Sequence, residues 1–212
     1  MDVFEAVWTT RAMRRLDPDR EVSDADIIKC IEAASKAATG GGREQTRYVV
    51  VRDPEVKAKI GAAYQKAGLA AFRGAVEAAG DNESQAARLA RSGLYLAEHI
   101  AESPALIVVC SSGDRAKQGA SVFPGVQNLF LAARALGLGT VMTTVHLANE
   151  AAVKDALAIP DDISTFCLVP IGYPLGRWGE AKRRPVSELI FWNRWGQPMP
   201  APSARADDAA RT

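Results

Sequence analysis

The stretch "GVQNLFLAARALGLGTVMTT", residues 125–144, decides which fold to expect. It continues a segment, 120–137, that is apolar on most faces, as is typical of a helix buried in a core or shared with a subunit interface. Gly137 suits the left-handed position that closes a helix. Residues 139–145 then have the composition of a strand. The sequence therefore predicts a buried helix that leads directly into a buried strand.

Other segments predict further elements of both kinds around this pair. Apolar runs predict buried strands at 47–54, 105–111 and 165–174, and apolar periodicity predicts helices at 2–9, 23–38, 55–79, 83–102 and 149–160. Together they indicate an α+β domain with a central mixed sheet covered by helices on both sides. We expect this domain to span residues 1–195. Residues 196–212, rich in Pro, Ala and charge, predict a disordered or extended C-terminal tail.

Composition excludes several classes of protein. The 212 residues carry a formal net charge of +1, with 48% hydrophobic and 24% charged residues, so a broad nucleic-acid surface is not expected. No run of about 18 apolar residues predicts a membrane span, and the N-terminus lacks the apolar core of a signal peptide. Three widely spaced cysteines are typical of buried thiols in a reducing compartment, so we expect a cytoplasmic protein.

A cluster of positive charge stands at residues 9–15, "TTRAMRR". On a helix, Arg11, Arg14 and Arg15 would project from one side. Two interpretations are open: solvated ion pairs with neighbouring acids, which are weakly stabilising, or contact with a phosphate, whose oxygens match the guanidinium fork.

Several catalytic motifs are absent. The sequence contains no G-x-G-x-x-G dinucleotide fingerprint, no P-loop and no G-x-S-x-G nucleophile elbow. Its two histidines lack companions at zinc-ligand spacing, so no metal site is expected. If the protein is an enzyme, a cofactor is expected to carry its chemistry.

Four blocks, in order, resemble the FMN-dependent nitroreductase family: "TTRAMRRLDPD", "AASKAATGGGREQTRYVVVRDP", "GVQNLFLAARALGLGTVMTT", and "VPIGYP" followed by "EAKRRPVSEL". The resemblance implies a homodimer with FMN at the subunit interface. It also implies which residues meet the cofactor. Arg11 and Arg14, with Ala12 and Met13 between them, and Arg183 match positions near the phosphate and ribityl end, whereas Arg15 could equally pair with Asp17 or Asp19. Thr144 matches the position nearest flavin N5, with Met142 and Thr143 beside it.

The second block departs from the family pattern. Gly42 stands where Asn is common and Glu44 where Gln is common, although a shift of one residue would restore Gln45 as the glutamine. We expect Gly41 and Gly42 to bring backbone N–H groups close to the flavin ring, because glycine places no side chain in the way. Glu44 would then shape the acceptor pocket. The alternative is that the three glycines form a flexible linker.

The resemblance further implies an activity. NAD(P)H would reduce FMN, and a small aromatic acceptor of the nitroaromatic or quinone type would then reoxidise it in a ping-pong reaction. Two alternatives stay open. One is a reductive dehalogenase like the deiodinase branch of the family, although its Glu-Tyr-Lys lid is not found within residues 64–99. The other is a flavin- or deazaflavin-binding protein with little turnover.

Overall fold

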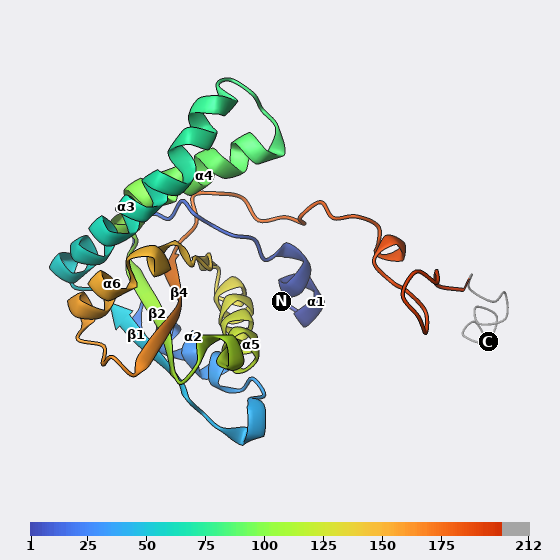
Figure 1. Cartoon of the computed structure of the whole chain (residues 1–212), viewed down its shortest axis with the longest axis horizontal. Coiled ribbons are helices and arrows are strands. Elements are labelled where there is room, and N and C mark those ends of the chain that lie inside the picture. The colour runs from blue at the N-terminus through green and yellow to red at the C-terminus, as the bar shows by residue number, and fades with distance from the viewer. Residues whose placement is uncertain (201–212) are drawn as a thin grey trace. The chain divides into compact units, whose positions relative to one another are not determined.

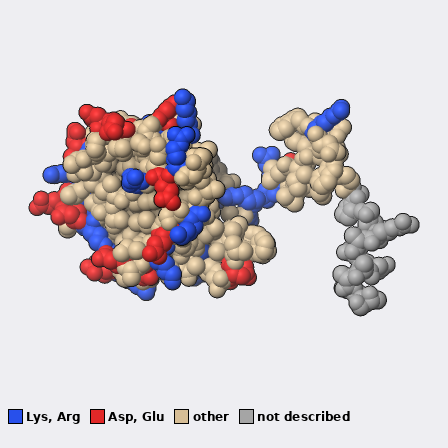
Figure 2. All heavy atoms as spheres, turned by 90° about the horizontal axis from the view of Figure 1, so that it is seen from below, with Lys and Arg blue, Asp and Glu red and all other residues tan. Residues whose placement is uncertain are grey.

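The computed structural model describes residues 1–200 and divides the chain into two units, Met1–Glu180 and residues 181–212. Figure 1 follows the chain through the helices and strands of the first unit. On the face seen in Figure 2, basic and acidic side chains are interspersed over this unit, as its near-neutral balance predicts. Among the described residues, none of the helices combines the length and apolar character needed to cross a membrane.

Four strands form the sheet of the first unit: β1 (Thr46–Val51), β2 (Ala105–Ser112), β3 (Gly139–Thr140) and β4 (Ile163–Gly172). Their order is β1-β2-β4-β3, and every neighbouring pair is antiparallel. The expected mixed sheet is therefore wrong. β2 and β3 are joined through one long helix, but β4 lies between them and runs in the opposite direction. A single isolated bridge, Ala12 with Thr140, is parallel.

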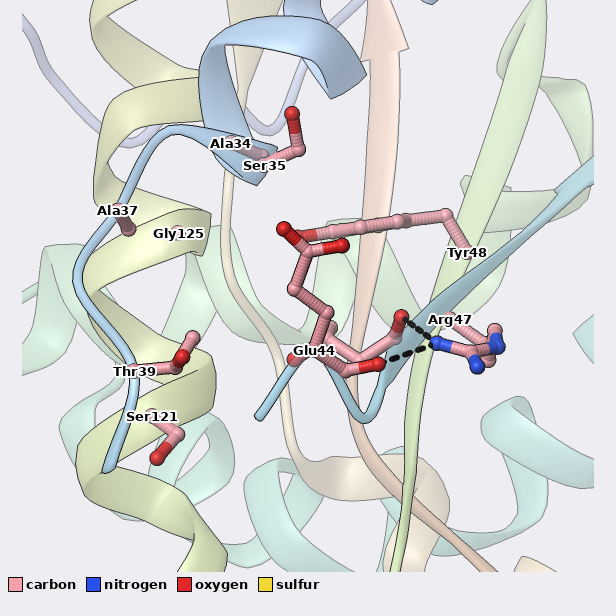
Figure 3. A pocket seen from close by; sticks show the side chains of 10 residues that line it. Ala34, Ser35, Ala37, Thr39, Glu44, Arg47, Tyr48, Ser121 and Gly125 are labelled. Carbon is pink, nitrogen blue, oxygen red and sulfur yellow. Dashed lines mark hydrogen bonds between the residues drawn. The ribbon is translucent and has the colours of Figure 1, made fainter. Parts of the chain in front are cut away.

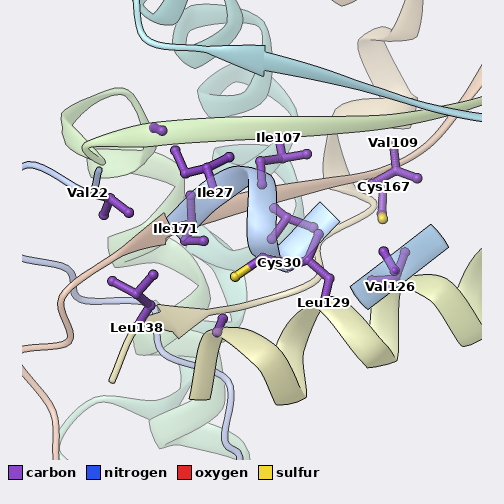
Figure 4. Packing of buried hydrophobic residues seen from close by; sticks show 14 of the residues in the cluster. Val22, Ile27, Cys30, Ile107, Val109, Val126, Leu129, Leu138, Cys167 and Ile171 are labelled. Carbon is purple, nitrogen blue, oxygen red and sulfur yellow. The ribbon is translucent and has the colours of Figure 1, made fainter. Parts of the chain in front are cut away.

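Helices cover both faces of this sheet, as the sequence predicts. They are α2 (Asp24–Ser35), α3 (Pro54–Ala79), α4 (Gln85–His99), α5 (Arg115–Ala135) and α6 (Glu150–Leu157), whereas α1 (Val3–Thr9) packs against α5. Alternate residues of β2 face opposite sides. Ile107 and Val109 pack with α2 and α5 (Figure 4), whereas Leu106 and Val108 pack with α3, α4 and α6. A strand buried on both sides explains the uninterrupted apolar run of the sequence.

Two expected boundaries near the central helix differ from the structure. α5 begins at Arg115, earlier than residue 120, because Asp114 caps it by accepting a hydrogen bond from the Ala116 N–H at 2.9 Å. β3 ends at Thr140, so the expected strand over 139–145 is wrong beyond that residue. Only Thr143 keeps a strand-like pairing, with Leu168, and the chain then turns into a short 3-10 helix, Val145–Asn149.

Helices α3 and α4 form a hairpin whose packing depends on glycine. A Cβ at Gly68 would collide with the Cβ of Ala97, whereas a Cβ at Gly74, in the same helix, would meet nothing within 4 Å. We expect Gly68→Ala to lower the free energy of unfolding by roughly 1–3 kcal/mol, as overpacking does. Gly74→Ala, the matched control, should raise it by up to about 1 kcal/mol because alanine favours the helix. Chemical denaturation measures both, and equal effects would contradict this packing.

The second unit contains a short 3-10 helix, Val186–Glu188, and a tight turn. In that turn the Trp192 N–H donates to the Gln197 carbonyl at 2.8 Å, and Phe191 pairs with Pro198. Of the tail expected at 196–212, residues 201–212 lie outside the described residues.

Candidate functional site

The arginine cluster lies on an extended segment after α1, so its side chains do not have the one-sided arrangement that a helix would give them. α1 ends at Thr9, and the next residues follow the edge of the sheet. The Met13 N–H donates to the Thr140 carbonyl at 2.9 Å, and Leu16 pairs with Pro174. These long-range backbone contacts replace the helical hydrogen bonds that a continuing α1 would have made. They place Ala12 beside β3 and bury the Met13 side chain in the core.

One cavity brings this segment together with the chain after β3. Its volume is about 400 Å³, and Arg14 and residues 141–145 form one side of it. The α3–α4 hairpin forms the opposite side with Tyr64, Phe72, Leu89, Ala90, Gly93 and Leu96. Four of the predicted cofactor-binding residues, Arg14, Met142, Thr143 and Thr144, therefore line a common cavity.

The three predicted residues after β3 differ in exposure. Met142 and Thr144 are exposed, whereas Thr143 is buried. The Thr143 hydroxyl lies 2.7 Å from the Tyr64 hydroxyl, in a buried hydrogen bond. Within residues 1–200, no hydrogen bond engages the Thr144 hydroxyl. Thr144 therefore offers its polar side chain to the cavity, while Thr143 uses its own inside the protein.

The arginines of the cluster, which are Arg11, Arg14 and Arg15, form no ion pairs within the described residues. Arg11 is exposed and Arg14 is partly buried at the cavity. The Arg15 guanidinium instead lies over the Tyr95 ring, 4.2 Å from its centroid, in a cation–π contact. The ion-pair interpretation of the cluster therefore finds no support here, and Arg14 is the cation best placed for an anionic ligand.

Thr39 and Glu44, the residues that flank the glycine loop at a short distance, line a second, smaller cavity of about 80 Å³ (Figure 3). Gly41 and Gly42 both have φ of 65°, a conformation that glycine adopts easily. The Gly40 N–H donates to the Ser121 hydroxyl on α5 at 3.0 Å, and the Gly42 N–H donates to the Thr39 carbonyl at 3.1 Å. The loop is thus a 3-10 turn that this hydrogen bond holds against α5.

Glu44 extends into this second cavity beside Tyr48. It does not line the cavity of Arg14 and Thr144 in the same chain. Arg183 belongs to the second unit, where one of its guanidinium nitrogens donates to the neighbouring Lys182 carbonyl at 3.3 Å.

Sequence reasoning missed the hairpin wall of the first cavity. Tyr64 and Phe72 are eight residues apart in α3, a spacing that places two side chains on one side of a helix. That spacing predicts a shared face, but the cavity opposite it is made by residues far along the chain. The hairpin wall is mostly apolar, and Arg14 is the one lining residue with a permanent charge.

A buried polar network lies just after the cavity segment. His146 is fully buried, and its Nε2 lies 3.1 Å from the Thr165 hydroxyl. That hydroxyl donates to Glu150 at 2.8 Å, and Arg115 pairs with Glu150 at 2.5 Å. Because the threonine proton goes to Glu150, His146 donates from Nε2. Burial lowers the pKa of His146 to about 4, so the ring is neutral at neutral pH.

The cysteines do not offer a nucleophile. All three cysteines are buried, and each has a free thiol. Burial raises the pKa of Cys30 and Cys110 to about 11 and that of Cys167 to about 12. Because the thiolate is the reactive form, these thiols are inert at neutral pH.

Comparison with known proteins places these features in a family context. The family model for the nitroreductase family matches residues 9–173. A protein of Archaeoglobus fulgidus, provisionally named NADH dehydrogenase/NAD(P)H nitroreductase, is 27% identical over 203 residues, which is 92% of this chain and 99% of that protein.

Two solved structures show a similar fold. An iodotyrosine deiodinase bound to FMN and 3-iodo-L-tyrosine aligns with a TM-score of 0.75 at 19% identity, covering 92% of this chain and 100% of its own. A provisionally assigned nitroreductase of Desulfovibrio desulfuricans in complex with FMN aligns with a TM-score of 0.66 at 23% identity, covering 92% and 98%.

Proposed function

Because this chain belongs to the nitroreductase family, we propose that it is an FMN-dependent NAD(P)H oxidoreductase that reduces small aromatic acceptors of the nitroaromatic or quinone type. The observation that carries the proposal is the cavity that joins Arg14 and Thr144 to the apolar wall of the α3–α4 hairpin. Hydride transfer through a flavin needs no side-chain nucleophile, so the inert cysteines are compatible with this function.

The residues of this cavity fit FMN. A phosphate monoester carries about −1.5 to −2 charges at neutral pH, and Arg14 is a partly buried cation with no carboxylate partner among residues 1–200. Phe72, Leu89 and Leu96 offer an apolar surface suited to a planar ring system. The Thr144 hydroxyl can donate or accept a hydrogen bond at the ring edge. We propose Arg11 and Arg183 as further phosphate contacts.

Within this proposal the chain binds and orients, while FMN supplies hydride transfer from NAD(P)H to the acceptor. Arg14 holds the anionic end. The apolar hairpin wall excludes water from the ring, which strengthens the polar contacts made there. Thr144 and Met142 face the space where an acceptor would lie against the flavin.

A second copy of the chain would complete the site. α1 exposes Val3, Phe4 and Trp8, with 63%, 63% and 59% of their surface accessible, and exposed apolar patches of this kind support association. In the proposed homodimer, the loop carrying Gly41, Gly42 and Glu44 would approach the FMN of the other subunit. The loop could then contact FMN as predicted, although within one chain Glu44 lines a different cavity from Arg14 and Thr144. Sedimentation at several protein concentrations tests the dimer.

The similarity in fold to an iodotyrosine deiodinase is compatible with the dehalogenase alternative, but the cavity wall does not favour it over the reductase. A halogenated tyrosine carries an ammonium group, which a carboxylate would recognise. No carboxylate lines the Arg14 cavity in the described chain.

We expect the purified protein to be yellow and to release FMN on denaturation. Anaerobic addition of NADH or NADPH should bleach the bound flavin within seconds, and a quinone should restore the colour. Recovery of no flavin, together with no rise in melting temperature on adding FMN, would contradict the proposed function. Bound flavin that NAD(P)H does not bleach would instead favour the low-turnover binding protein.

A further inference from the structure

Thr144 lies between two residues whose side chains are buried and hydrogen-bonded. Thr143 precedes it and His146 follows two positions later, and these are 8% and 0% exposed. Thr144 itself is exposed at the cavity. Among the described residues, the neighbouring side chains and the backbone therefore fix the cavity segment, because the Thr144 hydroxyl makes no hydrogen bond there, while the Thr144 carbonyl accepts from the Leu147 N–H at 3.0 Å.

The first anchor is the contact between Tyr64 and Thr143. Tyr64 is 1% exposed, and its hydroxyl lies 2.7 Å from Thr143 Oγ1. The same Oγ1 accepts a hydrogen bond from the Val145 N–H at 3.4 Å. Thr143 and Val145, the residues before and after Thr144, are therefore linked to each other and to Tyr64. The Thr143 backbone is also fixed, because its N–H and carbonyl exchange hydrogen bonds with Leu168 at 3.0 and 2.9 Å.

The second anchor is the contact between His146 and Thr165 on β4, 3.1 Å apart. Thr165 is held in turn by Glu150, which accepts from its N–H and its hydroxyl at 2.8 Å. This anchor fixes the start of the 3-10 helix that follows Thr144. Of the two anchors, only Tyr64 comes from the hairpin that walls the cavity.

We propose that Tyr64 is a positioning residue. Its hydroxyl, acting through Thr143, holds the Thr144 hydroxyl in the cavity and thereby sets how strongly the site distinguishes oxidised from reduced FMN. This inference rests on the proposed function. Reduction changes a flavin ring nitrogen from an acceptor into an N–H donor, so a polar group held in one place binds the two forms with different affinities.

The first experiment needs no flavin. Hydrogen exchange of the backbone amides is measured in the flavin-free protein and in Tyr64→Phe, which keeps the ring and removes only the hydroxyl. We expect exchange of the Val145 amide to become roughly three- to tenfold faster, the range for loss of one neutral hydrogen bond. Thr143→Val, which also removes the acceptor of the Val145 N–H, should give at least as large a change, and adding Tyr64→Phe to it should change the exchange little further. Tyr173→Phe is the matched control, because Tyr173 lies outside the cavity against Arg20. An unchanged exchange rate of the Val145 amide would contradict the claim that the Tyr64 hydroxyl fixes this segment.

The second experiment titrates flavin-free protein with oxidised FMN and, anaerobically, with reduced FMN. Tyr64→Phe should change the ratio of the two dissociation constants by about threefold or more, which is the order of a single neutral hydrogen bond. In a Thr144→Ala background it should change the ratio little further, and Tyr173→Phe should leave the ratio as in the wild type.

The outcomes distinguish failure of the positioning role of Tyr64 from failure of the proposed function. An unchanged ratio alongside a lower melting temperature would show that Tyr64 is merely structural and would overturn the positioning role. Fully additive effects of Tyr64→Phe and Thr144→Ala would overturn it as well. Failure of the wild type to bind either form of FMN would overturn the proposed function itself, and with it this inference.

Discussion

Replacement of Arg14 by alanine is expected to weaken FMN binding by roughly 1.5–3 kcal/mol, the range for a hydrogen bond to a charged group. This corresponds to an increase of about 10- to 150-fold in the dissociation constant. Arg14 is partly buried at the cavity, and no salt bridge within residues 1–200 neutralises it. Its charge is therefore available to a phosphate. Titration of the flavin-free protein with FMN measures the effect.

Arg20→Ala is the control for this prediction. Arg20 lies five residues from Arg15 on the same chain segment, but its guanidinium lies over the Tyr173 ring and does not line the cavity. Arg20→Ala should therefore change the affinity for FMN little. Equal small effects of Arg14→Ala and Arg20→Ala would show that the cluster acts only as a solvated charged surface. Arg183→Ala should resemble Arg14→Ala, and Arg184→Ala should have a much smaller effect.

The stability of the protein is expected to fall by roughly 2–3 kcal/mol as the pH is lowered from 6.5 to 4.5, because of His146. The pKa of this histidine is lowered from 6.5 to about 4 by burial, with Arg115 adding to the decrease and Glu150 opposing it. Above pH 6.5 the ring is neutral in both the folded and the unfolded chain. Below pH 6.5, His146 becomes protonated in the unfolded chain, whereas in the folded chain it stays neutral down to about pH 4. Protons therefore favour unfolding in this window.

His146→Gln is the matched variant, because an amide can still donate to Thr165 but does not titrate. The free energy of unfolding, measured with denaturant at pH 7, 5.5 and 4.5, should fall less steeply in the variant than in the wild type. The pKa of Glu150 is also lowered, by its hydrogen bonds to Arg115 and Thr165 acting against burial. Most of its contribution is lost below its ordinary value of 4.5, and the part lost above that value is common to the wild type and the variant, so it cancels when their slopes are compared. Parallel slopes in the two proteins would contradict the assignment to His146.

The sequence by itself determined the kinds of element and the parts of each that must be buried. β2 lies within one residue of its expected bounds, since an uninterrupted apolar run is stable only when both faces are covered. The body of α5 and the left-handed Gly137 after it follow from composition and local backbone preference, although the start of the helix at Arg115 was not predicted. The cluster of positive charge at residues 9–15 was also visible in the sequence.

Only the tertiary structure decided which residues meet. β4 inserts between β2 and β3 and makes the sheet antiparallel, a choice that depends on pairing across many residues. The backbone pairing of Met13 with Thr140 draws the arginines into an extended segment, although their spacing suited a helix. Thr143 and Thr144 are chemically identical neighbours, yet only one finds the buried Tyr64 hydroxyl. Local preference is weak beside these long-range contacts, because burying a backbone or hydroxyl group without a partner costs more than a residue's preference for helix or strand.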